Sequence, residues 1–112
     1  KRPEMGRAAT SRADAVWITS DNPRWEDPEA ILSMVAVGAP GAVQIADRAQ
    51  AIAQVIAQAA RADVVLLAGK GHENTQEIKG RHFPFDDAVH AQAALVAWAA
   101  HYSLPSSARA AV

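Results

Sequence analysis

The chain has 112 residues, of which 50% are hydrophobic and 5% aromatic, and this suffices for about one domain with a core of small and branched side chains. Abundant alanine favours helices and argues against an all-β sandwich. A net charge of -1 without a basic block, and no apolar stretch near the roughly 20 residues of a membrane span, predict neither nucleic acid nor a membrane as partner. The absence of cysteine excludes disulfides and thiolate metal sites.

The N-terminal third predicts helix, strand and helix. A thin apolar stripe indicates a helix over residues 4–13, and the apolar run AVWIT indicates a buried strand over 15–19. Asp27 then offers an N-cap before a proline, which predicts a helix over 27–37 that Gly38 ends.

The middle of the chain repeats this order. Short apolar runs predict strands over 42–45 and 64–68, and between them Asp47 caps a helix over 47–60 with apolar residues at helical spacing. Strands that alternate with helices in this way indicate parallel neighbours joined by right-handed crossovers.

A different pattern follows. Residues 77–83 resemble a small hairpin that turns at Lys79-Gly80, and Asp86 or Asp87 begins the last helix. The face expected to pack in that helix comprises Val89, Ala93, Val96, Ala97 and Ala100, with Leu95, Trp98 and Tyr102 on an adjoining stripe. Residues 103–112 lack periodicity and are expected to form an irregular tail or linker. The predicted class is therefore α/β: a mostly parallel sheet with helices on both faces and one small antiparallel hairpin.

Residues 21–24, Asp-Asn-Pro-Arg, follow the first predicted strand, at the sheet edge where open α/β sheets bind ligands. An ordinary turn explains them, because Asp21 and Asn22 can bond their own backbone and Pro23 fixes φ. Alternatively, Pro23 stiffens a binding loop that holds the Arg24 guanidinium where it grips a carboxylate through two parallel hydrogen bonds. The local sequence leaves both interpretations open.

Residues 69–73, Gly-Lys-Gly-His-Glu, follow the third predicted strand at the same edge. They form either a strand-to-loop turn with glycines at positive φ, or a binding loop in which Glu73 accepts from an ammonium group. A phosphate loop is excluded, since Lys70 follows a single glycine and His72 stands where Ser or Thr is needed. Together the two loops offer a guanidinium for a carboxylate and a carboxylate for an amine, which complements an amino acid.

The sequence gives little support for a metal site or a nucleophilic catalytic site. His72-Glu73 lacks the second histidine of a zinc-protease motif, the remaining histidines have no ligand spacing, and no serine lies in a nucleophile-elbow context. We therefore predict no catalytic residue and no metal site in this chain, and the residues assign no cofactor-binding position.

The stretches KRPEMGR, TSDNPRWEDPEAI, VVLLAGKGHENTQEI and FPFDD, in this order and spacing, resemble the C-terminal domain of the Mur ligases that add meso-diaminopimelate to UDP-N-acetylmuramoyl-L-alanyl-D-glutamate. The resemblance covers residues 1 to about 100, so we expect 1–102 to be this domain. Members of that family have an N-terminal domain for the UDP end, a central ATPase with a phosphate loop, and a Rossmann-like C-terminal domain. The first strand of that domain lies ahead of the position of Lys1, so the chain is expected to lack it.

The resemblance implies a site and a reaction. Asp21, Asn22, Pro23 and Arg24 correspond to the diaminopimelate recognition motif, and Gly69 and Glu73 line the same amino-acid site. The reaction is ATP-dependent amide formation in cytoplasmic peptidoglycan precursor synthesis, which supports cell-wall biogenesis, cell shape and division. ATP and Mg²⁺ bind mainly to the central domain and the UDP precursor contacts the other domains, so the isolated chain is expected to bind no cofactor and to be inactive. Relatives that add lysine differ at the position of Arg24.

Two alternatives remain beside this resemblance. A free-standing α/β module could bind an amino acid or dock to a partner without catalysis. A ligase of the same fold could act on another substrate, as in the folate or cyanophycin-type relatives, although Arg24 together with the loop at 69–73 disfavours it.

Overall fold

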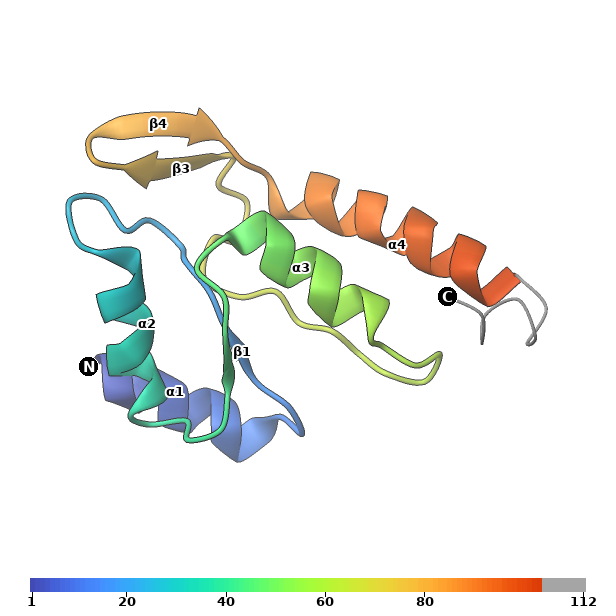
Figure 1. The fold of residues 1–112 in the computed structure, drawn as a ribbon, viewed down its shortest axis with the longest axis horizontal. Coiled ribbons are helices and arrows are strands. Elements are labelled where there is room, and N and C mark those ends of the chain that lie inside the picture. Colours follow the sequence, from blue (N-terminus) through green and yellow to red (C-terminus); the bar gives the residue numbers. More distant parts are fainter. Residues whose placement is uncertain (104–112) are drawn as a thin grey trace.

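The structure is a computed structural model that describes residues 1–103 (Figure 1). Along the chain, helices and strands alternate as far as α3 and are followed by two strands and a helix: α1 (Arg2–Arg12), β1 (Trp17–Ile18), α2 (Pro28–Ala36), β2 (Val43–Gln44), α3 (Arg48–Ala57), β3 (Thr75–Ile78), β4 (Arg81–Pro84) and α4 (Asp87–Ser103). This confirms the α/β class. The tail expected at 103–112 lies outside the described residues, except for Ser103, which ends α4.

Strands β1 and β2 are parallel neighbours, as predicted. Trp17 pairs with Val43, and the hydrogen bond from Ile45 N to Ile18 O, at 3.0 Å, extends the pairing beyond the two-residue strands. Both strands are shorter than the apolar runs 15–19 and 42–45, because only the central residues of the two runs pair with each other.

The predicted caps start two helices. The Asp27 carboxylate accepts from Glu29 N at 3.1 Å with Pro28 at the first helical position, and the Asp47 carboxylate accepts from Gln50 N at 3.2 Å. Asp and Asn side chains satisfy N–H groups that have no partner within the helix, so these sequence signals fix where α2 and α3 begin.

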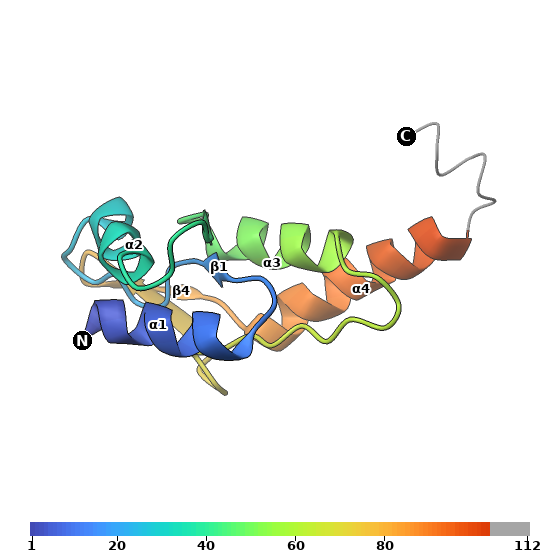
Figure 2. The same ribbon diagram turned by 90° about the horizontal axis from the view of Figure 1, so that it is seen from below.

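Helices α1 and α2 lie side by side because glycine lets their backbones meet (Figures 1 and 2). A Cβ atom on Gly6 would collide with the carbonyl oxygen of Val35, and one on Gly38 would collide with that of Pro3. Next to this contact, Ile18, Leu32 and Ala39 form a buried cluster that joins α2 to β1.

The third predicted strand is wrong for this structure. Residues 64–68 form no helix or strand and pair with no strand among the described residues, and the side chains of Val64 and Leu66 are 94% and 84% exposed. Apolar residues specify a buried strand only where a neighbouring strand supplies the hydrogen bonds, and within residues 1–103 no strand lies beside this run.

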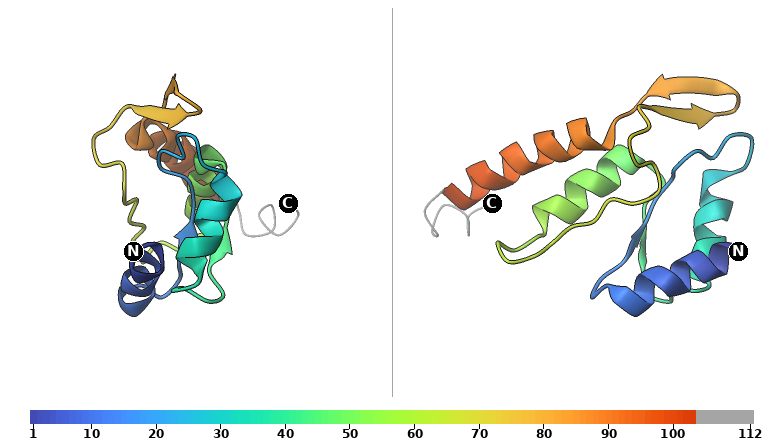
Figure 3. Two further views of the ribbon diagram at one scale, coloured as in Figure 1. Left: turned by 90° about the vertical axis from the view of Figure 1, so that its left-hand side faces the viewer. Right: turned by 180° about the vertical axis from the view of Figure 1, so that it is seen from behind.

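Strands β3 and β4 form the predicted antiparallel hairpin, which is the second sheet (Figure 3). Lys79 and Gly80 turn it with φ of 52° and 77°. Positive φ at both central residues is typical of the tight turn that matches the twist of two hydrogen-bonded strands.

The face predicted for α4 is also wrong. Val89 and Val96 are largely exposed, whereas Trp98 turns toward α3 and donates from Nε1 to Ala59 O at 2.7 Å. Figures 1 and 3 show α3 and α4 running side by side. Because α3 is the helix against which α4 packs, the buried stripe is the one that faces α3. In the described part of the chain, no helix combines the length and apolarity that a membrane crossing requires.

Candidate functional site

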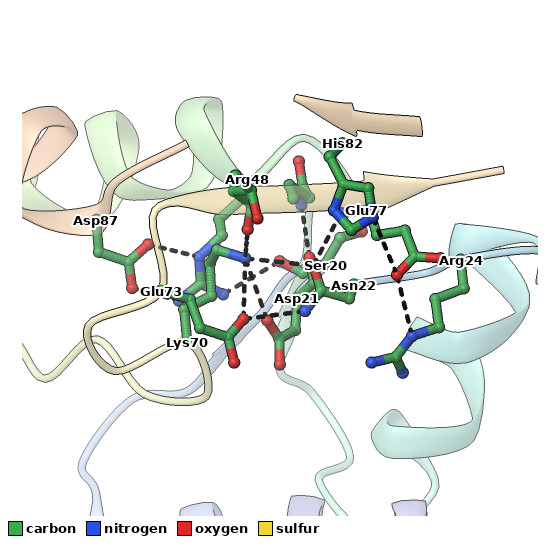
Figure 4. A network of polar contacts seen from close by, with 12 residues as sticks. Ser20, Asp21, Asn22, Arg24, Arg48, Lys70, Glu73, Glu77, His82 and Asp87 are labelled. Carbon is green, nitrogen blue, oxygen red and sulfur yellow. Dashed lines mark hydrogen bonds and ion pairs between the residues drawn. The ribbon is translucent and has the colours of Figure 1, made fainter. Parts of the chain in front are cut away.

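The two polar loops predicted to share a sheet edge meet in the structure (Figure 4). Asn22, in the loop after β1, donates from Nδ2 to Glu73 Oε1 at 3.1 Å, across 51 residues of sequence. Gly69 adopts a φ of 109°, and a Cβ there would lie 3.6 Å from Asp21 Oδ2. The backbone of the second loop therefore runs directly beside the carboxylate of the first.

Strand β3 fixes the path of the first loop. Arg24 N donates to Glu77 O at 3.0 Å, and Arg24 forms an isolated parallel bridge with Ile78. On the same strand, Glu77 N donates to Asn22 Oδ1 at 2.9 Å and the buried Gln76 donates to Asp21 O at 2.8 Å. These bonds hold Arg24 at a φ of 55°, a left-handed conformation that a non-glycine residue adopts only where its surroundings enforce it.

The Arg24 guanidinium is held far less firmly than its backbone. Its side chain is 64% exposed, and Nε lies 3.5 Å from Glu77 Oε1. The ends of the guanidinium fork have no hydrogen bond among the described residues, so donors remain available to an anion.

A cavity of about 230 Å³ opens between the loops. Its wall is mostly polar and comprises Arg2, Ser20, Asp21, Asn22, Pro23, Arg24, Ile31 and Glu73. Five of the six residues proposed from the sequence line it, and Gly69 lies immediately behind Asp21.

Arg2 also belongs to this wall, although the sequence did not place it in the amino-acid site. Its guanidinium donates to both carboxylate oxygens of Glu26, at 2.8 and 2.7 Å. The hydrogen bonds to Arg2 hold the pKa of the Glu26 carboxyl below its usual range, and the same contact raises the pKa of the Arg2 guanidinium. The pair ties the start of α1 to the segment between the first loop and α2.

Two buried cations behind the loops were also missed. Arg48, at the start of α3, donates to both oxygens of Asp87 at 2.7 Å and to Ser20 O and Ala68 O at 3.1 Å. It thereby joins the residue that precedes the first loop to the residue that precedes the second. One sequence signal could have indicated that Arg48 is buried: it is a charged residue directly after the Asp47 cap, in the first turn of a helix with an apolar face.

The other buried cation is Lys70, whose side chain is 0% exposed. Its Nζ donates to Thr75 O at 2.5 Å and lies 3.5 Å from Asp21 Oδ1 and 3.7 Å from Glu73 Oε1. The sequence placed Lys70 in a binding loop but gave it no role.

The arrangement is suited to a zwitterion. Two half-exposed carboxylates, Asp21 and Glu73, and one exposed guanidinium, Arg24, surround a single cavity. Among residues 1–103, no three histidine or acidic side chains gather closely enough to hold a metal ion. The chemistry that the side chains offer is recognition of an amine and a carboxylate.

Comparison with known proteins identifies the family of this chain. Residues 1–71 match the family described as Mur ligase, glutamate ligase domain. The UDP-N-acetylmuramoyl-L-alanyl-D-glutamate--2,6-diaminopimelate ligase of Ectopseudomonas mendocina (strain ymp) is 54% identical over 105 residues, which cover 90% of this chain and 22% of that protein. The enzyme of the same name from Acidovorax sp. (strain JS42) is 50% identical over 98 residues, which cover 85% of this chain and 20% of that protein.

A solved structure of an enzyme with this name superimposes with a TM-score of 0.81 at 48% identity, over 87% of this chain and 21% of that one. The chain thus spans about a fifth of the length of the relatives it matches. Because the family match covers more than half of the chain and the fold agrees, the chain belongs to the Mur ligase family.

Proposed function

We propose that this chain is the amino-acid-binding domain, residues 1–102, of an ATP-dependent ligase that adds meso-diaminopimelate to UDP-N-acetylmuramoyl-L-alanyl-D-glutamate in the cytoplasm. The observation that carries the proposal is the convergence of Arg24 with Asp21 and Glu73 around one cavity. Relatives of about 50% identity bear the name of this enzyme and support the choice of substrate.

Each end of the substrate has a complementary group. The Arg24 guanidinium takes the distal carboxylate of diaminopimelate through two parallel hydrogen bonds, while Glu73 and Asp21 take its ammonium group. Gly69 presents backbone beside Asp21 without a side chain that would reduce the space. Asn22 and Pro23 fix the loop that carries Arg24.

Arg24 gives selectivity against lysine. Lysine has no distal carboxylate, so its binding would leave the guanidinium without an anion in a closed site, and this costs free energy. In the absence of substrate, Glu77 partly neutralises Arg24 from 3.5 Å away.

ATP and Mg²⁺ do not fit the residues described here. His72 occupies the position of the hydroxyl residue of a phosphate loop, and Lys70 is buried under the loops rather than free to meet phosphates. We therefore assign ATP and Mg²⁺ to other parts of the longer protein. The task of this chain is to hold diaminopimelate so that its amine points out of the cavity toward the reacting carboxylate, and to keep water away from it.

We also infer that a strand of the longer protein lies beside residues 64–68 and completes a Rossmann-like sheet with helices on both faces. Val64 and Leu66 of this run are largely exposed, and an apolar cavity of about 270 Å³ separates the other side of the run from α3 and α4. Exposed apolar runs of this kind are stable only when another element covers them.

The test is an amide-forming assay with the full-length protein, ATP, Mg²⁺ and the UDP precursor, with diaminopimelate or lysine as acceptor. Mass spectrometry of the product should show addition of diaminopimelate and little addition of lysine. Absence of ATP-dependent product with either amino acid would favour a binding module without catalysis, and preferential lysine addition would overturn the assignment of Arg24.

A further inference from the structure

The buried ammonium group of Lys70 links the two loops. Its Nζ reaches the backbone carbonyl of Thr75, at 2.5 Å, and Asn22 Oδ1 in the other loop, at 3.4 Å. A lysine excluded from water needs partners of this kind, because an unpaired charge in a protein interior is unfavourable. The burial of Lys70 therefore depends on the acceptor groups that surround its Nζ.

Those groups include both carboxylates of the cavity. Asp21 Oδ1 lies 3.5 Å and Glu73 Oε1 3.7 Å from Nζ, and the two acidic side chains are 46% and 50% exposed. The ammonium group lies on their inner side, so it offsets their mutual repulsion while their outer sides stay open to the cavity. Two anions can then face one ammonium group of a ligand.

Lys70 also sets the orientation of the Asn22 amide. Oδ1 of Asn22 receives hydrogen bonds from Lys70 Nζ and from Glu77 N, so Nδ2 is turned toward Glu73 Oε1. Lys70, Asn22 and Glu73 form a closed ring of contacts that spans the two loops (Figure 4). Removal of the cation would leave the Asn22 amide held only by its bonds with Glu77 N and Glu73, and would leave Glu73 without the ammonium group on its inner side.

We propose that Lys70 is a positioning residue for the amino-acid substrate: through its contacts with Asp21, Asn22 and Glu73 it holds the carboxylates in the geometry that accepts an ammonium group. The inference rests on the proposed function. It adds a residue that does not line the cavity and that acts only through the residues that do.

The experiment compares Lys70→Met with Lys79→Met in the full-length protein. Lys79 lies exposed in the hairpin turn, and its backbone N–H donates to Arg24 O, so its replacement by methionine removes the same charge and leaves that backbone bond in place. Lys70→Met should raise KM for diaminopimelate at least tenfold and leave KM for ATP and for the UDP precursor within about twofold of wild type. Lys79→Met should change none of the three constants by more than about twofold.

Unequal effects on the three substrates separate positioning from a general loss of structure. An unchanged KM for diaminopimelate in Lys70→Met, or equal losses for all three substrates, would overturn the role of Lys70. Lys70→Gln, which keeps a donor for the Thr75 carbonyl but not the charge, should repeat the selective effect. If neither variant folds, Lys70 is a structural cation and the proposal is wrong. A wild-type protein that does not use diaminopimelate would instead overturn the proposed function.

Discussion

The Glu73 carboxylate is bound from one side by Asn22 and Lys70 and faces the cavity with the other. We predict that Glu73→Gln lowers kcat/KM for diaminopimelate by about tenfold or more, because a hydrogen bond to a charged group contributes about 1.5–3 kcal/mol. His82→Ala is the control, since the His82 side chain is exposed and its Nε2 lies 3.9 Å from Glu77 Oε1 rather than beside Glu73. Equal kinetics of Glu73→Gln and His82→Ala would contradict a role of Glu73 in holding the amine.

At the level of single residues, the sequence predicted the side chains that reach the cavity and missed those behind it. Asp21 and Arg24 could be found because charged residues after a buried strand gather at the sheet edge, and Glu73 because it belongs to a polar, glycine-bearing loop that follows an apolar run. Lys70 and Arg48 could not, because hydropathy places lysine and arginine outside, and their burial depends on carbonyl and carboxylate partners contributed by distant segments.

At the level of elements, the contact between α1 and α2 depends on glycines, which have no side chain. We predict that Gly38→Ala destabilises the protein by about 1–3 kcal/mol, the usual cost of overpacking, because the added methyl group meets the Pro3 carbonyl. Urea unfolding compares the stability of Gly38→Ala with that of the control variant Ala9→Ser, which changes an exposed position on α1. A Gly38→Ala protein as stable as Ala9→Ser would show that the helices lie further apart.

The Arg2–Glu26 pair should make the attachment of α1 depend on pH. The pKa of Glu26 is lower in the folded than in the unfolded state, so the pair stabilises the fold above about pH 4.3 and the stabilisation is lost as the pH falls further. Glu26→Gln should therefore lower the urea midpoint at pH 7, and its difference from wild type should shrink as the pH falls below about 4. A difference that stays constant between pH 7 and pH 3.5 would exclude this origin.

Helix positions were predictable because α2 and α3 carry local start signals in Asp27 and Asp47. The strands were predictable only as far as their partners lie within the chain. Residues 15–19 and 42–45 pair with each other, whereas 64–68 has the composition of a buried strand but no partner strand in the described part of the chain. The prediction of the packed face of α4 was wrong for a different reason. Alanine occurs on every side of that helix, so the hydrophobic pattern does not identify the face that contacts α3.

At the level of the whole molecule, the exposed run 64–68 makes a prediction about the longer protein. If a further strand lies beside it, peptides that cover 64–68 should be protected from hydrogen exchange about as well as peptides that cover 42–45. Hydrogen exchange followed by mass spectrometry of the full-length protein measures both. Exchange of 64–68 as fast as that of the exposed hairpin turn would show that no strand is added there.

The central claim is that Arg24 selects the distal carboxylate of diaminopimelate. The most direct measurement is the ratio of kcat/KM for diaminopimelate to kcat/KM for lysine, in the full-length wild type, in Arg24→Ala and in Arg12→Ala, whose exposed arginine lies at the end of α1. Loss of two hydrogen bonds to a charged group should lower the ratio at least about 100-fold in Arg24→Ala and leave it unchanged in Arg12→Ala. A change of less than about threefold in Arg24→Ala, roughly 0.7 kcal/mol, would contradict the account, because Arg24 would then be only a charge on a loop.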